Sequence, residues 1–154
     1  MVTIASSADA FDNVRKGFAL SLGGGGGFYL ERGDKNSDVV ISLPVLIGWG
    51  VTERNIFYLD KQILFAKCSD SSWCMEQSLG IMWQHFWLKQ NKLFSLLGLT
   101  ALDNEGTQYD ITAGIGYEFR QHWAFSLSYD ATRFSGGRLL NRDMVAAHLW
   151  YMWY

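Results

Sequence analysis

The sequence predicts an all-β protein: a transmembrane, antiparallel, up-and-down β-barrel of eight strands. Three observations predict it. Apolar and polar residues alternate with period two through most of the chain, which is the pattern of strands with two different faces. Each alternating segment is long enough to cross a bilayer, for which a tilted strand needs about 9–11 residues, whereas soluble strands average about 5–6. The connections between the segments alternate between short and long, as they do in membrane barrels.

The clearest alternation is W-A-F-S-L-S-Y-D at Trp123–Asp130, where aromatic and aliphatic residues take every second position. The segment Tyr109–Arg120 alternates in the same way and places Asp110 and Glu118 on its polar face, together with Arg120. The eight predicted strands are Lys16–Leu30, Val39–Gly50, Asn55–Ala66, Ser78–Leu88, Lys92–Leu102, Gln108–Arg120, His122–Arg133 and Arg142–Tyr154.

The connections predict how the barrel is oriented. Short turns on one rim and longer loops on the other are typical of bacterial membrane barrels, in which both termini lie on the short-turn side. Residues 16–154 are therefore predicted to form the barrel, and residues 1–15 a periplasmic tail or a short plug. The short turns are Val51–Arg54, Lys89–Asn91 and the surroundings of Gln121, and the long loops are Glu31–Asp38, Lys67–Gln77, Asp103–Thr107 and Phe134–Asn141.

Composition excludes several classes of protein. The chain has 154 residues, which is one domain, and a net charge of −2, which gives no basic excess for nucleic acid. No stretch approaches the about 18 consecutive apolar residues of a transmembrane helix. Met1–Val14 has neither the charged start nor the apolar centre of a signal peptide. Either the protein is cytosolic or the numbering starts on a mature chain with an added initiator Met, and the barrel pattern of the rest of the sequence favours the second.

Aromatic residues and glycines mark special positions in the predicted strands. Tyr and Trp favour the membrane–water interface, and an aromatic belt is therefore predicted near the short-turn ends. The five-glycine run Gly23–Gly27 lies inside the first strand, and we expect its lumen-facing members to make room for bulky neighbours such as Tyr58 or Tyr151. It lacks the ending and the following helix of a phosphate loop. The predicted belt is Trp49, Phe57, Trp87, Phe94, Phe119, Trp123 and Tyr154.

Three stretches resemble a known group of proteins. Arg15–Leu30 (RKGFALSLGGGGGFYL) is similar to an opening barrel strand, and Tyr109–Thr132 (YDITAGIGYEFRQHWAFSLSYDAT) to a penultimate hairpin. Ala146–Tyr154 (AAHLWYMWY) resembles the C-terminal signal that the barrel-insertion machinery reads. The chain thus resembles the small eight-stranded bacterial outer-membrane β-barrel proteins, the group with OmpX-like, Ail-like and OmpW-like members.

The resemblance implies a place in the bacterial outer membrane and contact with its lipid and lipopolysaccharide. It also implies that the last strand is read by the barrel-insertion machinery. We expect a monomer with no cofactor, no metal and no nucleic-acid partner. In the C-terminal signal the outward positions are Tyr154, Met152 and Trp150, His148 departs from the expected apolar residue, and the inward set is Trp153, Tyr151 and Leu149.

Polar residues on the inward faces predict a lumen network. An isolated buried charge is costly, so we expect Arg120 to pair with Glu118 or Asp60. Eight strands enclose an interior that side chains can fill, so a structural network is expected first and a gate or ion path is the alternative. The predicted lumen residues are Glu31, Asp60, Gln62, Gln84, Asp110, Glu118, Arg120, Ser126, Ser128, Asp130 and Arg133.

A hydrolase site needs a nucleophile, a base and an orienting acid in mutual reach. The best available set is Ser126 or Ser128 with His148 and Glu118. Strand parity predicts that His148 and Ser126 point to opposite faces, so no catalytic residue is predicted. His85 and His122 are interpreted as interfacial residues rather than metal ligands.

The long loops carry the remaining candidates. Cys68 and Cys74 are predicted to form a disulfide if the chain is exported, and two free thiols are the alternative. Trp73 between them is a candidate contact residue, because aromatic residues often anchor interfaces. Arg138 lies in the last loop, where it and its neighbours Arg133 and Arg142 are candidates for contact with lipopolysaccharide phosphates.

The first functional hypothesis is an integral barrel with a structural or surface-interaction role carried by its extracellular loops. A narrow channel or carrier for small solutes is the alternative, and a lipid-modifying outer-membrane enzyme is the second alternative. A soluble lipid-binding barrel is the rival outside the membrane, and it requires apolar side chains inside and polar ones outside.

Overall fold

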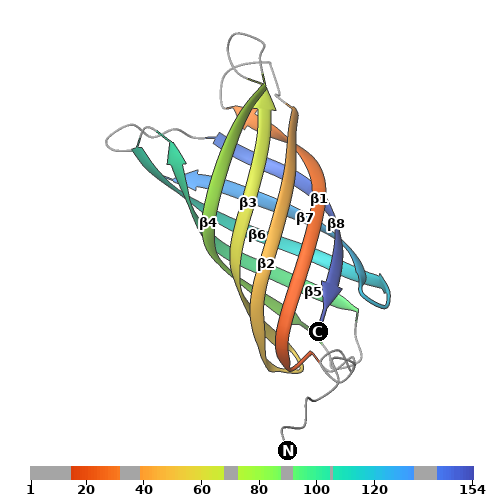
Figure 1. Ribbon diagram of the computed structural model, residues 1–154. Coiled ribbons are helices and arrows are strands. Elements are labelled where there is room, and N and C mark those ends of the chain that lie inside the picture. Colours follow the sequence, from red (N-terminus) through yellow and green to blue (C-terminus); the bar gives the residue numbers. More distant parts are fainter. Residues whose placement is uncertain (1–14, 32–38, 68–72, 88–91, 105, 134–141) are drawn as a thin grey trace, which may run out of the picture.

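A computed structural model describes residues 15–31, 39–67, 73–87, 92–104, 106–133 and 142–154 of the chain. These residues form a closed barrel in which each strand pairs with the next (Figure 1). The predicted all-β, eight-stranded antiparallel barrel is confirmed. No helix in the described ranges is long and apolar enough to span a membrane. The strands are β1 (Gly17–Glu31), β2 (Val39–Thr52), β3 (Asn55–Lys67), β4 (Trp73–Phe86), β5 (Leu93–Asn104), β6 (Gly106–Arg120), β7 (Trp123–Arg133) and β8 (Arg142–Trp153).

The first and last strands close the barrel, because β1 pairs with β8 from Leu20 opposite Trp153 to Glu31 opposite Arg142. We call the end of the barrel that holds Arg15, Tyr154 and the short β2–β3 and β6–β7 turns the turn end, and the opposite end the loop end. Among the eight described strands, the closed ladder leaves none with an unpaired edge, which removes the usual site of edge-to-edge aggregation.

The two faces of the wall differ in chemistry. Large apolar side chains point outward: the exposed fraction is 64% for Ile81, 60% for Trp49 and 48% for Leu99. Along β2, exposed and buried residues alternate through most of the strand, as expected when successive side chains point to opposite faces. A soluble lipid-binding barrel requires the reverse arrangement, which this barrel does not have.

The lumen is layered. An apolar layer fills the turn end, where the rings of Phe86 and Phe94 lie 5.3 Å apart. A smaller apolar cluster that includes Tyr29 and Val40 lies toward the loop end. Polar side chains occupy the lumen between them. The turn-end layer consists of Ala19, Leu46, Ile56, Tyr58, Met82, Phe86, Phe94, Leu96, Ala124, Trp150, Met152 and Tyr154.

The predicted facing of β8 is wrong. Trp150, Met152 and Tyr154 point inward, with exposed fractions of 4%, 2% and 5%, whereas Leu149 is 46% exposed on the outside. Both faces of this segment are apolar, so hydrophobicity alone does not fix its parity, and a shift of one residue exchanges the faces. Phe94 of the predicted belt is also buried in the lumen, at 1% exposed.

The lumen-facing glycines of β1 make room for large side chains of β8. A Cβ atom at Gly23 would lie 2.7 Å from Cε3 of Trp150, and one at Gly25 would lie 2.6 Å from Cδ2 of His148. The neighbours are therefore Trp150 and His148 rather than the predicted Tyr151, because Tyr151 faces outward with the other odd-numbered residues of β8.

Candidate functional site in the barrel lumen

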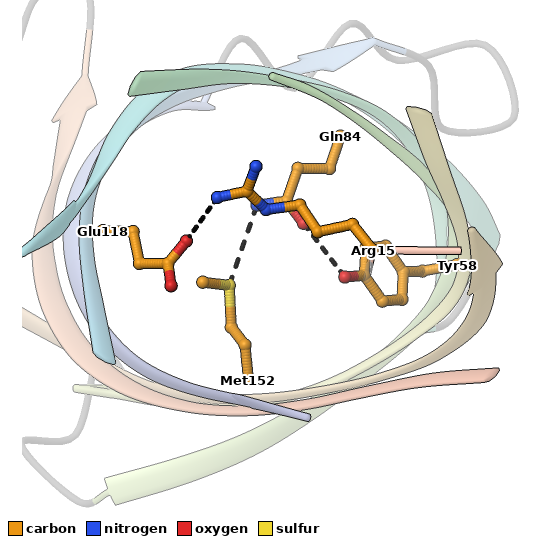
Figure 2. Close-up of polar contacts among 5 residues, drawn as sticks. All are labelled: Arg15, Tyr58, Gln84, Glu118 and Met152. Carbon is orange, nitrogen blue, oxygen red and sulfur yellow. Dashed lines mark hydrogen bonds and ion pairs between the residues drawn. The ribbon is translucent and has the colours of Figure 1, made fainter. Parts of the chain in front are cut away.

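Arg15 closes the turn end of the lumen. Its Nη2 atom lies 2.7 Å from Oε2 of Glu118, and Figure 2 shows the two side chains reaching toward each other across the barrel. Its guanidinium carbon lies 3.6 Å from the ring centroid of Phe86 and 5.7 Å from that of Tyr154. The cation is held by a carboxylate and by aromatic faces, both of which attract positive charge.

Arg120 lies outside the lumen, which differs from the prediction. Its side chain is exposed, and the β6–β7 register shifts between Glu118 and Arg120. The turn that follows contains His122, whose φ of 67° lies in the left-handed region. Because the shift interrupts the alternation of faces, the side chain of Arg120 points away from the lumen. Glu118 forms its ion pair with Arg15 instead.

A series of polar contacts crosses the lumen beside Arg15. The hydroxyl of Tyr58 donates to Oε1 of Gln84 at 2.9 Å, and Nε2 of Gln84 lies 3.7 Å from the sulfur of Met152 (Figure 2). Ser21 Oγ lies 3.5 Å from the same hydroxyl. These contacts connect β1, β3, β4 and β8 through the interior.

The middle of the lumen contains two further polar clusters. In the first, Ser42 Oγ lies 2.5 Å from Nε2 of His148. In the second, Asp130 accepts hydrogen bonds from Thr112 and, at 3.3 Å, from Ser128. Asp130 is therefore held by hydroxyl donors on both carboxylate oxygens.

Between these clusters lies a cavity of about 20 Å³, which is room for about one water molecule. Asp60 lines it, is 2% exposed, and its Oδ1 has no hydrogen-bond partner among the described residues. The cavity therefore presents a buried, incompletely satisfied carboxylate. Its lining residues are Pro44, Asp60, Gln62, Met82, Leu96, Thr112, Ser128, Asp130, His148 and Trp150.

The structure places most of the candidate lumen residues inside the barrel. Gln62 is half-buried. The side chains of Glu31 and Arg133 lie outside the part that the structure describes. The buried candidates are Asp60, Gln84, Asp110, Glu118, Ser126, Ser128 and Asp130.

The structure describes only some of the candidate residues in the loops. Trp73 begins β4 at the loop end and is 54% exposed. Arg138 and Cys68 lie outside the described residues. The surface role of Arg138 and the disulfide between Cys68 and Cys74 therefore stay predictions.

Ser126 and His148 both point into the lumen and lie directly opposite each other on β7 and β8. The prediction that they face opposite sides is therefore wrong. Ser126 Oγ instead accepts a hydrogen bond from Nε1 of Trp150 at 2.8 Å, and Ser126 is 0% exposed. His148 contacts Ser42 through Nε2, so each member of the pair is engaged with another lumen side chain and the two do not contact each other in a nucleophile–base arrangement.

Three important lumen residues were not predicted from the sequence: Arg15, Ser42 and Trp150. Ser42 is a single polar residue in the apolar segment Val39–Leu43, and this isolation is a signal that it faces a polar lumen. Arg15 directly precedes the first strand, so the sequence pattern places it in the predicted tail. Among the described residues, no group of three or more His, Cys, Asp or Glu side chains could hold a metal ion.

A solved structure resembles this barrel. Neisserial surface protein A, an eight-stranded outer-membrane barrel, superposes with a TM-score of 0.60 at 12% sequence identity, covering 90% of this chain and 97% of that chain. The likeness shows the fold: the chain has the architecture of the small outer-membrane barrels. No protein-family model and no curated protein matches the sequence.

Proposed function

We propose that the chain is an integral barrel of the bacterial outer membrane that does not conduct solutes and that acts through its extracellular segments. The observation that carries this proposal is the outward apolar face around a layered, filled lumen. Ile47, Leu59 and Ile115 are 48%, 53% and 57% exposed on that face. Such a surface is stable when lipid covers it, and it is a liability in water.

Aromatic residues near the turn end support this placement. Trp49 is 60% exposed, Trp87 53% and Trp123 37%. Together with Phe57 and Phe119 they would form an aromatic girdle at one membrane–water interface. In barrels of this class the short turns lie in the periplasm, so the turn end is periplasmic in this proposal and the loop end faces the outside.

The turn-end layer supports a closed lumen. Phe86, Phe94 and Met152 are each at most 2% exposed, and the Arg15–Glu118 pair lies against Phe86. Packing of this kind among the described residues supports a turn end that is closed to solutes. A closed lumen leaves the extracellular segments as the surface on which a function can act.

The loop end carries the candidate contact residues. Trp73 is exposed there, and a disulfide between Cys68 and Cys74 would hold it in place. Arg138 belongs to the last loop, and its guanidinium is suited to bidentate contact with phosphate. Lipopolysaccharide is the phosphate-bearing partner that a barrel in this membrane meets at this end.

Ion flux into liposomes that carry the refolded protein tests the closed lumen. A heat-dependent gel shift first establishes that the barrel has inserted. We expect flux equal to that of protein-free liposomes. Flux above this level would overturn the proposal and favour the narrow channel.

Binding of lipopolysaccharide to the refolded protein in detergent micelles tests the loop surface. Arg138→Ala is expected to weaken binding, whereas Arg54→Ala, at an exposed arginine of the turn end, is expected to leave it unchanged. Equal effects of the two substitutions would show that the loop end has no special role.

A further inference from the structure

We propose that the lumen cavity between Asp60 and Asp130 binds one small monovalent cation of the size of Na⁺. This site is independent of the proposed function, because it lies in the interior and requires nothing of the extracellular segments. Three observations support the site: the positions of the two carboxylates, the unpaired Oδ1 of Asp60 and the size of the cavity.

The two carboxylates approach one cavity from different walls. Asp60 lies on β3 and Asp130 on β7, which are separated by three strands in either direction around the closed barrel. Both line the cavity and both are buried, at 2% and 8% exposed. Two like charges enclosed in one narrow lumen raise each other's energy unless a positive charge lies between them.

The described lining offers Asp60 no positively charged partner. Oδ1 of Asp60 has no hydrogen-bond partner among the described residues, and a buried carboxylate without partners is costly. No lysine or arginine is among the residues that line the cavity. Arg15 lies at the turn end, where Glu118 is its ion-pair partner.

The lining defines the class of cation. The polar groups around the cavity are the carboxylates of Asp60 and Asp130, the hydroxyls of Thr112 and Ser128, the amide of Gln62 and the imidazole of His148. Most of them offer oxygen, the ligand that hard cations prefer. The volume of about 20 Å³ holds a single particle of the size of water. Mg²⁺ keeps several waters and Ca²⁺ takes 6–8 oxygen ligands, so a bare monovalent ion fits better.

Thermal unfolding of the refolded barrel tests the site. The midpoint is read from the heat-dependent gel shift, with N-methyl-D-glucamine chloride replaced stepwise by NaCl at constant ionic strength. A ligand that binds only the folded state raises the midpoint in a saturable way. We expect this rise in the wild type and no rise in Asp60→Asn or Asp130→Asn. Glu76→Gln is the matched control, because Glu76 is a half-buried carboxylate of β4 outside the cavity, and it should keep the rise.

Three outcomes would overturn the proposal: equal midpoints in the two salts for the wild type, an unchanged Na⁺ response in both aspartate variants, or a response to Ca²⁺ without one to Na⁺. A second measurement needs no variant. Crystals of the wild type soaked in thallous salt should show an anomalous peak between Asp60 and Asp130, and a cavity without that peak would contradict the site.

Discussion

Arg15 and Glu118 are 103 positions apart in the chain, yet Arg15 Nη2 lies 2.7 Å from Glu118 Oε2 at the turn end. The same guanidinium lies over the ring of Phe86. One residue in front of β1 thus contacts β4 and β6 through the interior. It seals the apolar layer that fills this end of the barrel.

Arg15→Met is expected to lower the free energy of unfolding by about 2–4 kcal/mol, because it leaves the Glu118 carboxylate without its ion-pair partner. This is somewhat less than the about 3–5 kcal/mol of a fully buried pair, since the two side chains are 13% and 9% exposed. Urea unfolding in lipid vesicles measures it. The double variant Arg15→Met/Glu118→Gln should lose less stability than Arg15→Met alone. A larger loss in the double variant would mean that the pair is not the source of the effect.

Gly23→Ala is expected to destabilise the barrel by about 1–3 kcal/mol, the usual cost of overpacking. Its Cβ would lie 2.7 Å from Cε3 of Trp150 and 2.9 Å from Cγ of Pro44. Gly24→Ala is the neighbouring control, because its Cβ meets only Leu43 Cδ2 at 3.8 Å. It should be neutral or slightly stabilising, since glycine is unfavourable inside a strand. Equal losses in the two variants would refute the steric explanation.

Ile81→Arg is expected to cost about 2–4 kcal/mol in vesicles, the range for a charge at the bilayer midplane, whereas a charge near the interface costs about 0–1 kcal/mol. Ile81 lies near the middle of β4 and is 64% exposed. Val51→Arg, at a 56% exposed position beside a turn, is the shallow control. Unfolding free energies in phosphatidylcholine vesicles give the comparison. If both substitutions cost the same, the outward face is not spanning a bilayer in the proposed orientation.

Tyr58→Phe is expected to cost about 1–2 kcal/mol, because it leaves buried Oε1 of Gln84 without its hydrogen-bond donor. Tyr151→Phe removes a hydroxyl from the outer face, where the ring contacts with Trp123 and Trp153 are kept, and it should change stability little. Urea unfolding of both variants measures the difference, and a Tyr151→Phe loss as large as that of Tyr58→Phe would argue against the lumen network.

The strands could be predicted because the two sides of the wall are different environments. In β7, Phe125 and Leu127 face outward and Ser126 faces inward, and the sequence alternates accordingly. Boundaries were less certain where polar residues continue a strand. Glu76 and Gln77 are typical of a loop by composition, so the predicted strand begins at Ser78. In the structure β4 begins at Trp73, and the exposures of its residues alternate from there.

The site was harder to predict because it depends on the facing of β8, on a register shift and on closure of the barrel, none of which is visible in the alternation of residues. In β8 both faces are apolar, so alternation alone does not fix the facing of Trp150, and the resemblance to a C-terminal signal predicts the reverse of the observed inward position. The register shift beside Arg120 has no distinct sequence signal. Arg15 pairs with Glu118 across the barrel. This short distance exists because the barrel is closed, and the alternation of residues along single strands does not show it.

The pairing of β1 with β8 has a consequence for how the protein reaches its final state. In this seam Gly23 lies opposite Trp150 and Gly27 opposite Ala146. Contacts between the two ends of a chain carry the largest entropic cost of loop closure, and until they form, two strands present unsatisfied backbone groups. The glycine-rich side of the seam has few side-chain atoms to rearrange, so we expect backbone hydrogen bonding between β1 and β8 to dominate the closure of the barrel. Shortening the chain at its C-terminal end would remove the β8 residues with which β1 pairs, and the barrel could not close.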